Sequence, residues 1–184
     1  LTQCKYKGVS GTSVAQDFVE LPSQIMEHWA VEPEVLKVYA KHYKTGEVIP
    51  DELIRKIQDQ NTFNQEFMTT ELLAAALLDM ELHNLTDTAS LDVVAFEKAV
   101  MDKLGLIPEI APRYRATYFN HILSGYAAGY YSYLWAEVLD ADAFEAFKEH
   151  GLFDKNTADS FRRNVLEKGG SSCSSVLISK FVSS

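Results

Sequence analysis

The sequence contains only two cysteines, so it lacks the sites that clustered cysteines build. Cys4 and Cys173 lie near opposite ends of the chain and belong to no metal-binding or redox spacing. Two cysteines placed in this way fit a reducing compartment, and a single long-range disulfide between them stays open as the alternative.

Concentrated positive charge and long apolar runs are also missing. The 26 acidic residues outnumber the 17 basic ones, which gives a net charge of −9, and no cluster of lysine or arginine stands out. A surface that binds nucleic-acid phosphates needs such a cluster. The longest uninterrupted apolar run, residues 72–78, is far too short to span a bilayer. We therefore expect neither a nucleic acid nor a membrane as a partner.

Alternation of polar and apolar residues, which marks β-strands, is absent over any useful length. Helical periodicity and helix-ending signals recur along the chain instead. The sequence therefore predicts an all-α fold without internal repeats. Helices are expected from Asp17 onward, around His121, and over residues 33–43, 51–60, 63–83, 91–103, 134–147 and 157–168.

Two of these helices carry apolar residues at helical spacing, which predicts the faces that they bury. In the helix over residues 63–83, the expected inward stripe is Leu72, Leu73, Ala76, Leu77 and Met80. In the helix over residues 91–103 and just beyond it, we expect Val94, Phe96, Val100 and Leu104 to face inward.

The chain is expected to divide near its C-terminal end. Residues 1–170 are predicted to form the helical body, and residues 171–184 a serine-rich tail. Apolar residues within this tail leave two alternatives open, a flexible segment or a packed apolar strip.

Residues 125–135, here called the Gly/Tyr segment, interleave glycine and alanine with tyrosine. Glycine lets the backbone approach a ligand closely, and a tyrosine hydroxyl both donates and accepts hydrogen bonds. One interpretation is a mobile loop that delivers phenol hydroxyls to a ligand. The alternative is a tight helix contact with half-buried tyrosines.

Four polar residues share one helical face about 80° wide near the start of the first expected helix. They are Asp17, Glu20, Gln24 and Glu27, while Ile25 and Trp29 lie elsewhere and can face the core. One interpretation is a solvated face. The other is a metal-ligating carboxylate held by neighbouring polar groups.

Two stretches resemble motifs of the thimet oligopeptidase (M3) family of zinc metallopeptidases. Residues 17–24 (DFVELPSQ) are similar to the signature that follows the family's active-site helix, and residues 121–144 to its substrate-binding segment. Residues 72–83 and 112–115 resemble the bacterial peptidyl-dipeptidase (dipeptidyl carboxypeptidase) branch more than the endopeptidase branch. The likeness runs in order over about residues 1–170. It implies the multi-helical C-terminal portion of a zincin-type catalytic domain.

The resemblance implies a zinc ion held by two histidines of an HExxH helix and by a glutamate of the next helix, which is Glu20 here. Such a site leaves one position open for a water that the metal activates. His121, Tyr126 and Tyr133 are the implied catalytic residues, because donors aimed at a developing oxyanion stabilise it. Tyr130 is implied to bind substrate.

The remaining candidate substrate-binding residues are two glycines and two arginines. Gly125 and Gly129 belong to the Gly/Tyr segment that the resemblance assigns to substrate binding. Arg113 or Arg115 would supply the cation that a carboxypeptidase-type enzyme needs for the terminal carboxylate of its substrate. For both arginines, a surface ion pair or a loop anchor is the alternative.

No HExxH motif occurs in these 184 residues, and no two of the five histidines are four residues apart. By the family spacing, the second histidine would lie roughly six residues before Leu1. We therefore interpret the chain as a fragment that lacks two zinc ligands and the general base and is inactive alone. The alternatives are an M3-type oligo-endopeptidase and a non-catalytic helical peptide-binding module.

The expected partners follow from this interpretation. They are an oligopeptide substrate and the missing N-terminal part of the same enzyme. Apolar surface that this part would cover is expected to cause self-association. The expected location is the bacterial cytoplasm, with the periplasm as the alternative.

Overall fold

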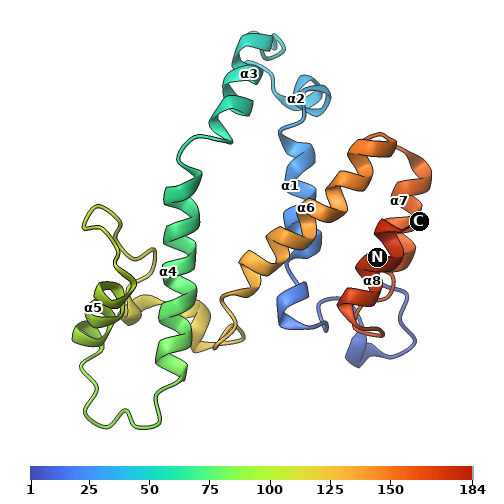
Figure 1. Ribbon diagram of the computed structural model, residues 1–184. Coiled ribbons are helices and arrows are strands. Elements are labelled where there is room, and N and C mark those ends of the chain that lie inside the picture. The colour runs from blue at the N-terminus through green and yellow to red at the C-terminus, as the bar shows by residue number, and fades with distance from the viewer. Residues whose placement is uncertain (184) are drawn as a thin grey trace. The chain divides into compact units, whose positions relative to one another are not determined.

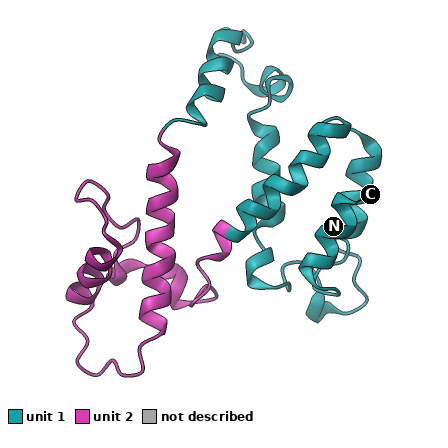
Figure 2. Cartoon of the chain, viewed as in Figure 1, with its two compact units in different colours: residues 1–63, 135–184 teal, residues 64–134 magenta. Residues whose placement is uncertain are grey.

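The computed structural model of the chain describes residues 1–183 and forms two compact units (Figures 1 and 2). Unit 1 comprises residues 1–63 together with those from 135 onward, and unit 2 comprises residues 64–134. Within the described residues the only β feature is an isolated antiparallel bridge between Lys41 and Val48. The all-α prediction is therefore confirmed.

The α-helices are α1 Leu21–Ala30, α2 Pro33–Tyr39, α3 Asp51–Gln60, α4 Gln65–His83, α5 Val93–Leu104, α6 Ser132–His150, α7 Lys155–Phe161 and α8 Ser174–Val182. Short 3-10 helices are η1 Lys7–Val9, η2 Gln16–Phe18, η3 Ala116–Tyr118 and η4 Asn120–Leu123, and a π-helix, η5, covers Arg162–Leu166. Among residues 1–183, no helix has both the length and the apolar character needed to cross a membrane.

The first helix begins four residues later than the sequence predicts. Asp17 lies within η2, and α1 starts at Leu21 with Glu20 immediately before it. Pro22 explains the shift, because a proline ring clashes with the carbonyl group four residues earlier in a continuous helix. Gln24 still donates its backbone N–H to the carbonyl oxygen of Glu20 at 3.0 Å.

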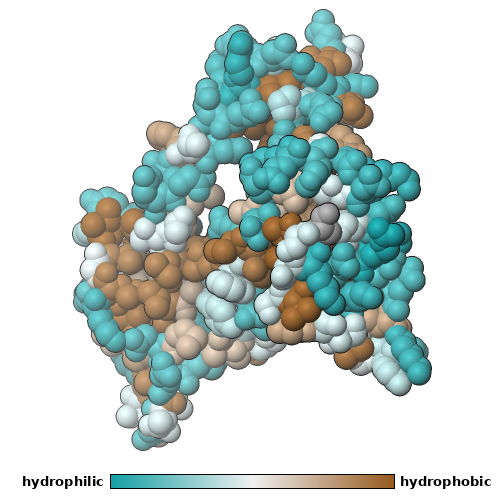
Figure 3. Space-filling view, turned by 45° about the vertical axis from the view of Figure 1, so that its right-hand side comes forward, coloured by the Kyte–Doolittle hydropathy of each residue, from teal (hydrophilic) through white to brown (hydrophobic). Residues whose placement is uncertain are grey.

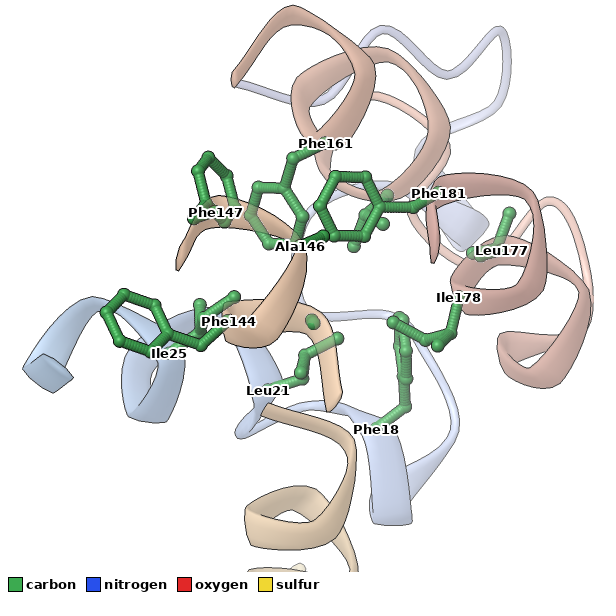
Figure 4. Packing of buried hydrophobic residues seen from close by; sticks show 12 residues of the cluster. Phe18, Leu21, Ile25, Phe144, Ala146, Phe147, Phe161, Leu177, Ile178 and Phe181 are labelled. Carbon is green, nitrogen blue, oxygen red and sulfur yellow. The ribbon is translucent and has the colours of Figure 1, made fainter. Parts of the chain in front are cut away.

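Unit 1 is built around an aromatic core (Figure 4). Phe147 of α6, Phe161 of α7 and Phe181 of α8 have ring centroids 5.2–6.0 Å apart. Ile25 of α1 is fully buried in the same cluster and Trp29 packs against it, as the sequence predicts. Truncation of one such phenylalanine costs about 3–5 kcal/mol of stability, so this cluster is a main source of stability for the unit.

The C-terminal tail forms helix α8, whose Leu177, Ile178 and Phe181 are buried in the core of unit 1. Of the two alternatives for the tail, the structure therefore shows the packed one. Position 184 lies outside the described residues.

The N-terminal residues of unit 1 pack against the segment around the double glycine, Gly169 and Gly170. Gly170 donates its backbone N–H to the carbonyl oxygen of Val9 at 2.8 Å, and Gln3 donates its own to the carbonyl of Glu167 at 3.0 Å. A Cβ atom added at Gly170 would collide with the carbonyl oxygen of Ser13. Glycine is therefore required here by the close approach of two backbone segments.

Unit 2 places helix α4 between two sets of partners. Ala74 and Leu78 pack with Val100 and Met101 of α5. Ala75 and Ala76 pack with the segment that contains η4. Small alanine side chains allow close approach on both sides of the helix, so its buried residues do not form one stripe.

The predicted inward stripes are therefore only partly correct. In α4, Ala76 is buried, but Leu73 and Met80 are 45% and 38% exposed. In α5, Val100 is buried, whereas Val94 is 56% exposed. The buried apolar residues of α4 are three consecutive alanines and Leu78, which do not follow the predicted stripe.

Replacing Gly170 with alanine is expected to lower the free energy of unfolding by about 1–3 kcal/mol, because the new methyl group forces two backbone segments apart. The matched control is Gly8→Ala in the same unit, where an added Cβ meets open space. Urea denaturation of both variants measures the difference. Equal midpoints for the two variants would contradict this packing.

Candidate functional site

Glu20 lies between η2 and α1 and is partly buried. The hydroxyl of Ser23 donates to Oε2 of Glu20 at 2.9 Å and to its backbone carbonyl oxygen at 2.8 Å. A neighbouring hydroxyl of this kind orients a carboxylate. Of the predicted polar face, Asp17 and Gln24 are also partly buried, while Glu27 is exposed.

A metal ion needs several ligands in one place, and Glu20 alone is only one carboxylate. Within residues 1–183, no three His, Cys, Asp or Glu side chains form a group that could hold a metal ion. The described residues therefore do not complete a metal site around Glu20.

His28 of α1 contacts Asp140, a residue 112 positions further along the chain. Its Nε2 lies 2.7 Å from Oδ1 of Asp140 in α6, and its ring stacks on Phe144 with centroids 4.4 Å apart. Asp140 is 3% exposed. This pair fixes α1 against α6 within unit 1, and with it the helix that begins at Glu20.

The predicted catalytic and substrate-binding rings of unit 2 form one cluster. The ring of His121 lies with its centroid 5.2 Å from that of Tyr130, 6.0 Å from that of Tyr126 and 6.1 Å from that of Tyr133. Tyr126 and Tyr133 stack at 5.4 Å with an interplanar angle of 7°. The fold thus brings together four candidate residues from one short stretch of sequence.

Two further aromatic residues, Tyr114 and Phe119, pack against this cluster. Tyr114 stacks on buried Phe119 with centroids 4.8 Å apart, and its ring centroid is 5.0 Å from that of His121. Sequence reasoning assigned no role to Tyr114. Its position between the two candidate arginines was the available signal.

The backbone of the Gly/Tyr segment is held by a buried acid that sequence reasoning missed. Asp79 of α4 is fully buried, and its carboxylate accepts the backbone N–H groups of Ala128 and Tyr130, each at 2.9 Å. No pattern marked Asp79, because it stands within an apolar helix.

The two candidate glycines differ in their surroundings. Gly125 is exposed with open space around it, and Gly129 is buried. Neither has a positive φ; the left-handed conformation of this segment falls on Ala128, with φ +51°. The conformational freedom expected from glycine is therefore not used for an unusual backbone angle at these positions.

The two candidate arginines also have different environments. Nε of Arg115 donates to Oε1 of buried Glu97, whose other oxygen accepts the backbone N–H of Ala116 at 2.7 Å. This contact is the loop anchor considered above as an alternative. Arg113 is exposed, and its guanidinium carbon lies 5.9 Å from the centroid of the Tyr114 ring.

Burial raises the pKa of the Tyr130 phenol well above its ordinary value of 10.0, and the neighbouring Tyr114 contributes in the same direction. The positive charge of Arg113 acts against this shift. Tyr130 is 3% exposed, and its raised pKa keeps the buried hydroxyl protonated at neutral pH.

The free energy of unfolding is expected to fall as the pH rises above about 10, because unfolded Tyr130 then loses a proton that the folded state retains. Replacing Tyr130 with phenylalanine removes this contribution. The control Tyr43→Phe makes the same change on an 84% exposed side chain. Urea unfolding of the three proteins over the alkaline range measures the slope. An unchanged slope in Tyr130→Phe would argue against a buried phenol.

The sequence matches the model of peptidase family M3 over residues 1–184. It is 45% identical over 170 residues to the dipeptidyl carboxypeptidase of Escherichia coli (strain K12), covering 91% of this chain and 25% of that relative. It is 42% identical over 176 residues to oligopeptidase A of Salmonella typhimurium (strain LT2), covering 93% of this chain and 26% of that relative.

An organellar oligopeptidase A of Arabidopsis thaliana is 40% identical over 164 residues, covering 86% of this chain and 21% of that relative. The chain thus spans about a quarter of the length of the bacterial relatives that it matches. Since the family model matches its whole length, the resemblance seen in the motifs is confirmed, and the chain belongs to peptidase family M3.

Proposed function

We propose that this chain is the C-terminal part of a zinc metallopeptidase that releases dipeptides from the C-terminus of oligopeptides. In this proposal it contributes the third zinc ligand and the Gly/Tyr segment, and it is inactive alone because it contains no HExxH motif. The dipeptidyl carboxypeptidase of Escherichia coli, at 45% identity, supports this choice of reaction.

The single observation that carries the proposal is the ring cluster of unit 2. His121, Tyr126 and Tyr133 present an imidazole and two phenols within ring distances of 5.4–6.1 Å. Peptide hydrolysis passes through a tetrahedral species with negative charge on oxygen, and preorganised donors stabilise that charge. In the proposed enzyme, these side chains bind the substrate carbonyl and donate hydrogen bonds to the oxyanion.

Glu20 is proposed to be one ligand of the zinc ion, together with two histidines from the missing part of the enzyme. When bound, the ion would polarise the scissile carbonyl and lower the pKa of a bound water. The role of this chain at that position is to hold one carboxylate, oriented by the Ser23 hydroxyl at 2.9 Å.

Arg113 is the stronger candidate of the two arginines for the substrate's terminal carboxylate. It is exposed and lies beside Tyr114, which packs against His121. Arg115 is already engaged with Glu97 through Nε. A guanidinium group can bind a carboxylate in a bidentate manner, which would select free C-termini.

The proposed partners are an oligopeptide and the remaining part of the enzyme. We further propose that the chain by itself associates through apolar surface, which Figure 3 shows as brown areas among polar atoms. Exposed apolar side chains of α4 include Phe67, Met68 and Leu73. For the parent enzyme we propose the bacterial cytoplasm, with the periplasm as the alternative; both cysteines in the described residues are free thiols.

An oligo-endopeptidase is the second candidate, favoured by the 42% identity to oligopeptidase A of Salmonella typhimurium. The two activities differ in whether the substrate's free C-terminal carboxylate is recognised. A helical peptide-binding module without catalysis is the third candidate, and it predicts peptide binding without hydrolysis.

The whole enzyme that contains this chain is expected to lose zinc when Glu20 is replaced with glutamine, with affinity lowered on the order of 10-fold or more because a charged ligand becomes neutral. The matched control is Glu27→Gln in α1, the helix that follows Glu20, where the acid is exposed. Metal content after dialysis, measured by inductively coupled plasma mass spectrometry, gives the result. Full zinc occupancy in Glu20→Gln would exclude this ligand.

The reaction class is tested with one pentapeptide in two forms, with a free and with an amidated C-terminus. The proposed enzyme should release a C-terminal dipeptide from the free form and cleave the amidated form on the order of 10-fold or more slowly, since it loses a charge-assisted contact. Mass spectrometry of the products measures both rates. Equal internal cleavage of both forms would identify an endopeptidase, and binding without cleavage the non-catalytic module.

A further inference from the structure

Asp79 is the most deeply buried acidic residue of unit 2, and two of its partners are backbone amides about 50 residues away in the sequence. Its side chain is completely inaccessible. One carboxylate oxygen accepts the backbone N–H of Ala128 and the other accepts that of Tyr130, each at 2.9 Å. A buried carboxylate is strongly destabilising unless such donors satisfy it, so the position of these two amides is coupled to the fold of α4.

The two amides flank Gly129, in the middle of the Gly/Tyr segment. Ala128 adopts φ +51°, a left-handed conformation that is uncommon for a residue with a side chain. Such a conformation persists only where the surrounding structure holds it. The two hydrogen bonds to Asp79 restrain the backbone at Ala128 and at Tyr130, on either side of Gly129.

His83, one turn further along α4, supports the carboxylate. Its Nδ1 lies 2.8 Å from Oδ1 of Asp79 and 2.9 Å from the backbone oxygen of the same residue. Asp79 therefore has three nitrogen partners, two of which belong to the Gly/Tyr segment. The third comes from its own helix and fixes the carboxylate in place.

We propose that Asp79 is a positioning residue for substrate binding, which fixes the backbone at Ala128 and Tyr130 and thereby orients the rings of Tyr126, Tyr130 and Tyr133. Its importance for the reaction rests on the proposed function. In this proposal, the Asp79 carboxylate binds backbone amides of the Gly/Tyr segment and does not contact the substrate.

A purely structural role in the core is the competing explanation, and unit 2 contains a matched residue that separates the two. Glu97 of α5 is also a buried acid that accepts a backbone amide, that of Ala116, and its side-chain partner is the guanidinium group of Arg115. It makes these contacts outside the Gly/Tyr segment. Loss of either carboxylate would destabilise unit 2, but only loss of Asp79 would release residues 128–130.

The test compares Asp79→Asn with Glu97→Gln in the complete chain, using hydrogen exchange of backbone amides followed by NMR. In Asp79→Asn, exchange at Ala128 and Tyr130 should accelerate on the order of 10-fold or more, because a charge-assisted hydrogen bond is lost and the amide group adds a competing donor. In Glu97→Gln, these two amides should be affected less than that of Ala116. Equal acceleration at Ala128 and Tyr130 in both variants would overturn the proposal.

If Asp79→Asn fails to fold, amide exchange in the wild-type chain still tests whether Asp79 holds the segment. The amide of Ala127 bonds only to a backbone carbonyl, that of Ser124, at 3.4 Å. Ala128 and Tyr130 should exchange on the order of 10-fold or more slowly than Ala127, at rates that follow those of α4. Exchange of all three at one rate would refute anchoring by Asp79.

A separate measurement tests whether the hydrogen bonds of Asp79 to the Gly/Tyr segment affect peptide binding. Titration of the whole enzyme with a synthetic pentapeptide should show affinity reduced about 10-fold in Asp79→Asn and little changed in Glu97→Gln, because peptide binding must then order the released segment. Equal affinity in Asp79→Asn and wild type would refute the positioning role. Failure of the wild-type enzyme to bind the peptide would refute the proposed function, while the exchange rates would still decide whether Asp79 holds the segment.

Discussion

Satisfaction of buried acids by backbone amides is the interaction on which unit 2 depends. Asp79 takes two amides from the Gly/Tyr segment, and Glu97 takes the amide of Ala116 in the segment that leads to the ring cluster. Both segments lack long regular helices, and their internal backbone hydrogen bonds, such as Gly129 N–H to the carbonyl oxygen of Tyr126 at 2.9 Å, span single turns. A buried carboxylate on a neighbouring helix adds a long-range restraint, because a buried carboxylate without hydrogen-bond donors is strongly destabilising.

Unit 1 also contains a buried acid, but its partner is a histidine side chain and not a backbone amide. Asp140 of α6 is buried and contacts His28, which stacks on Phe144. This contact holds α1, whose first turn follows Glu20. In both units, helices that pack through apolar residues carry one inward acid each that fixes a neighbouring element. Part of the acidic excess of the sequence therefore serves the interior.

The all-α class and the candidate rings could be predicted because they depend on local pattern and on motifs contiguous in sequence. His121 and the tyrosines lie within 13 positions, so any fold that keeps the stretch compact brings them together. Asp79 could not be found this way, since the two backbone amides that it accepts are about 50 residues away and backbone amides leave no sequence signal. The predicted stripe of α4 is only partly correct because the spacing of apolar residues does not reveal which contacts alanine fills.

The most direct measurement is a crystal structure of the whole enzyme with zinc and a bound peptide, including anomalous diffraction data at the zinc edge. The proposed function predicts a zinc peak within ligand distance, about 2.0–2.2 Å, of a Glu20 carboxylate oxygen. It also predicts the hydroxyls of Tyr126 and Tyr133 within hydrogen-bond distance of the peptide. A zinc site without Glu20, or a peptide bound away from the ring cluster, would contradict it.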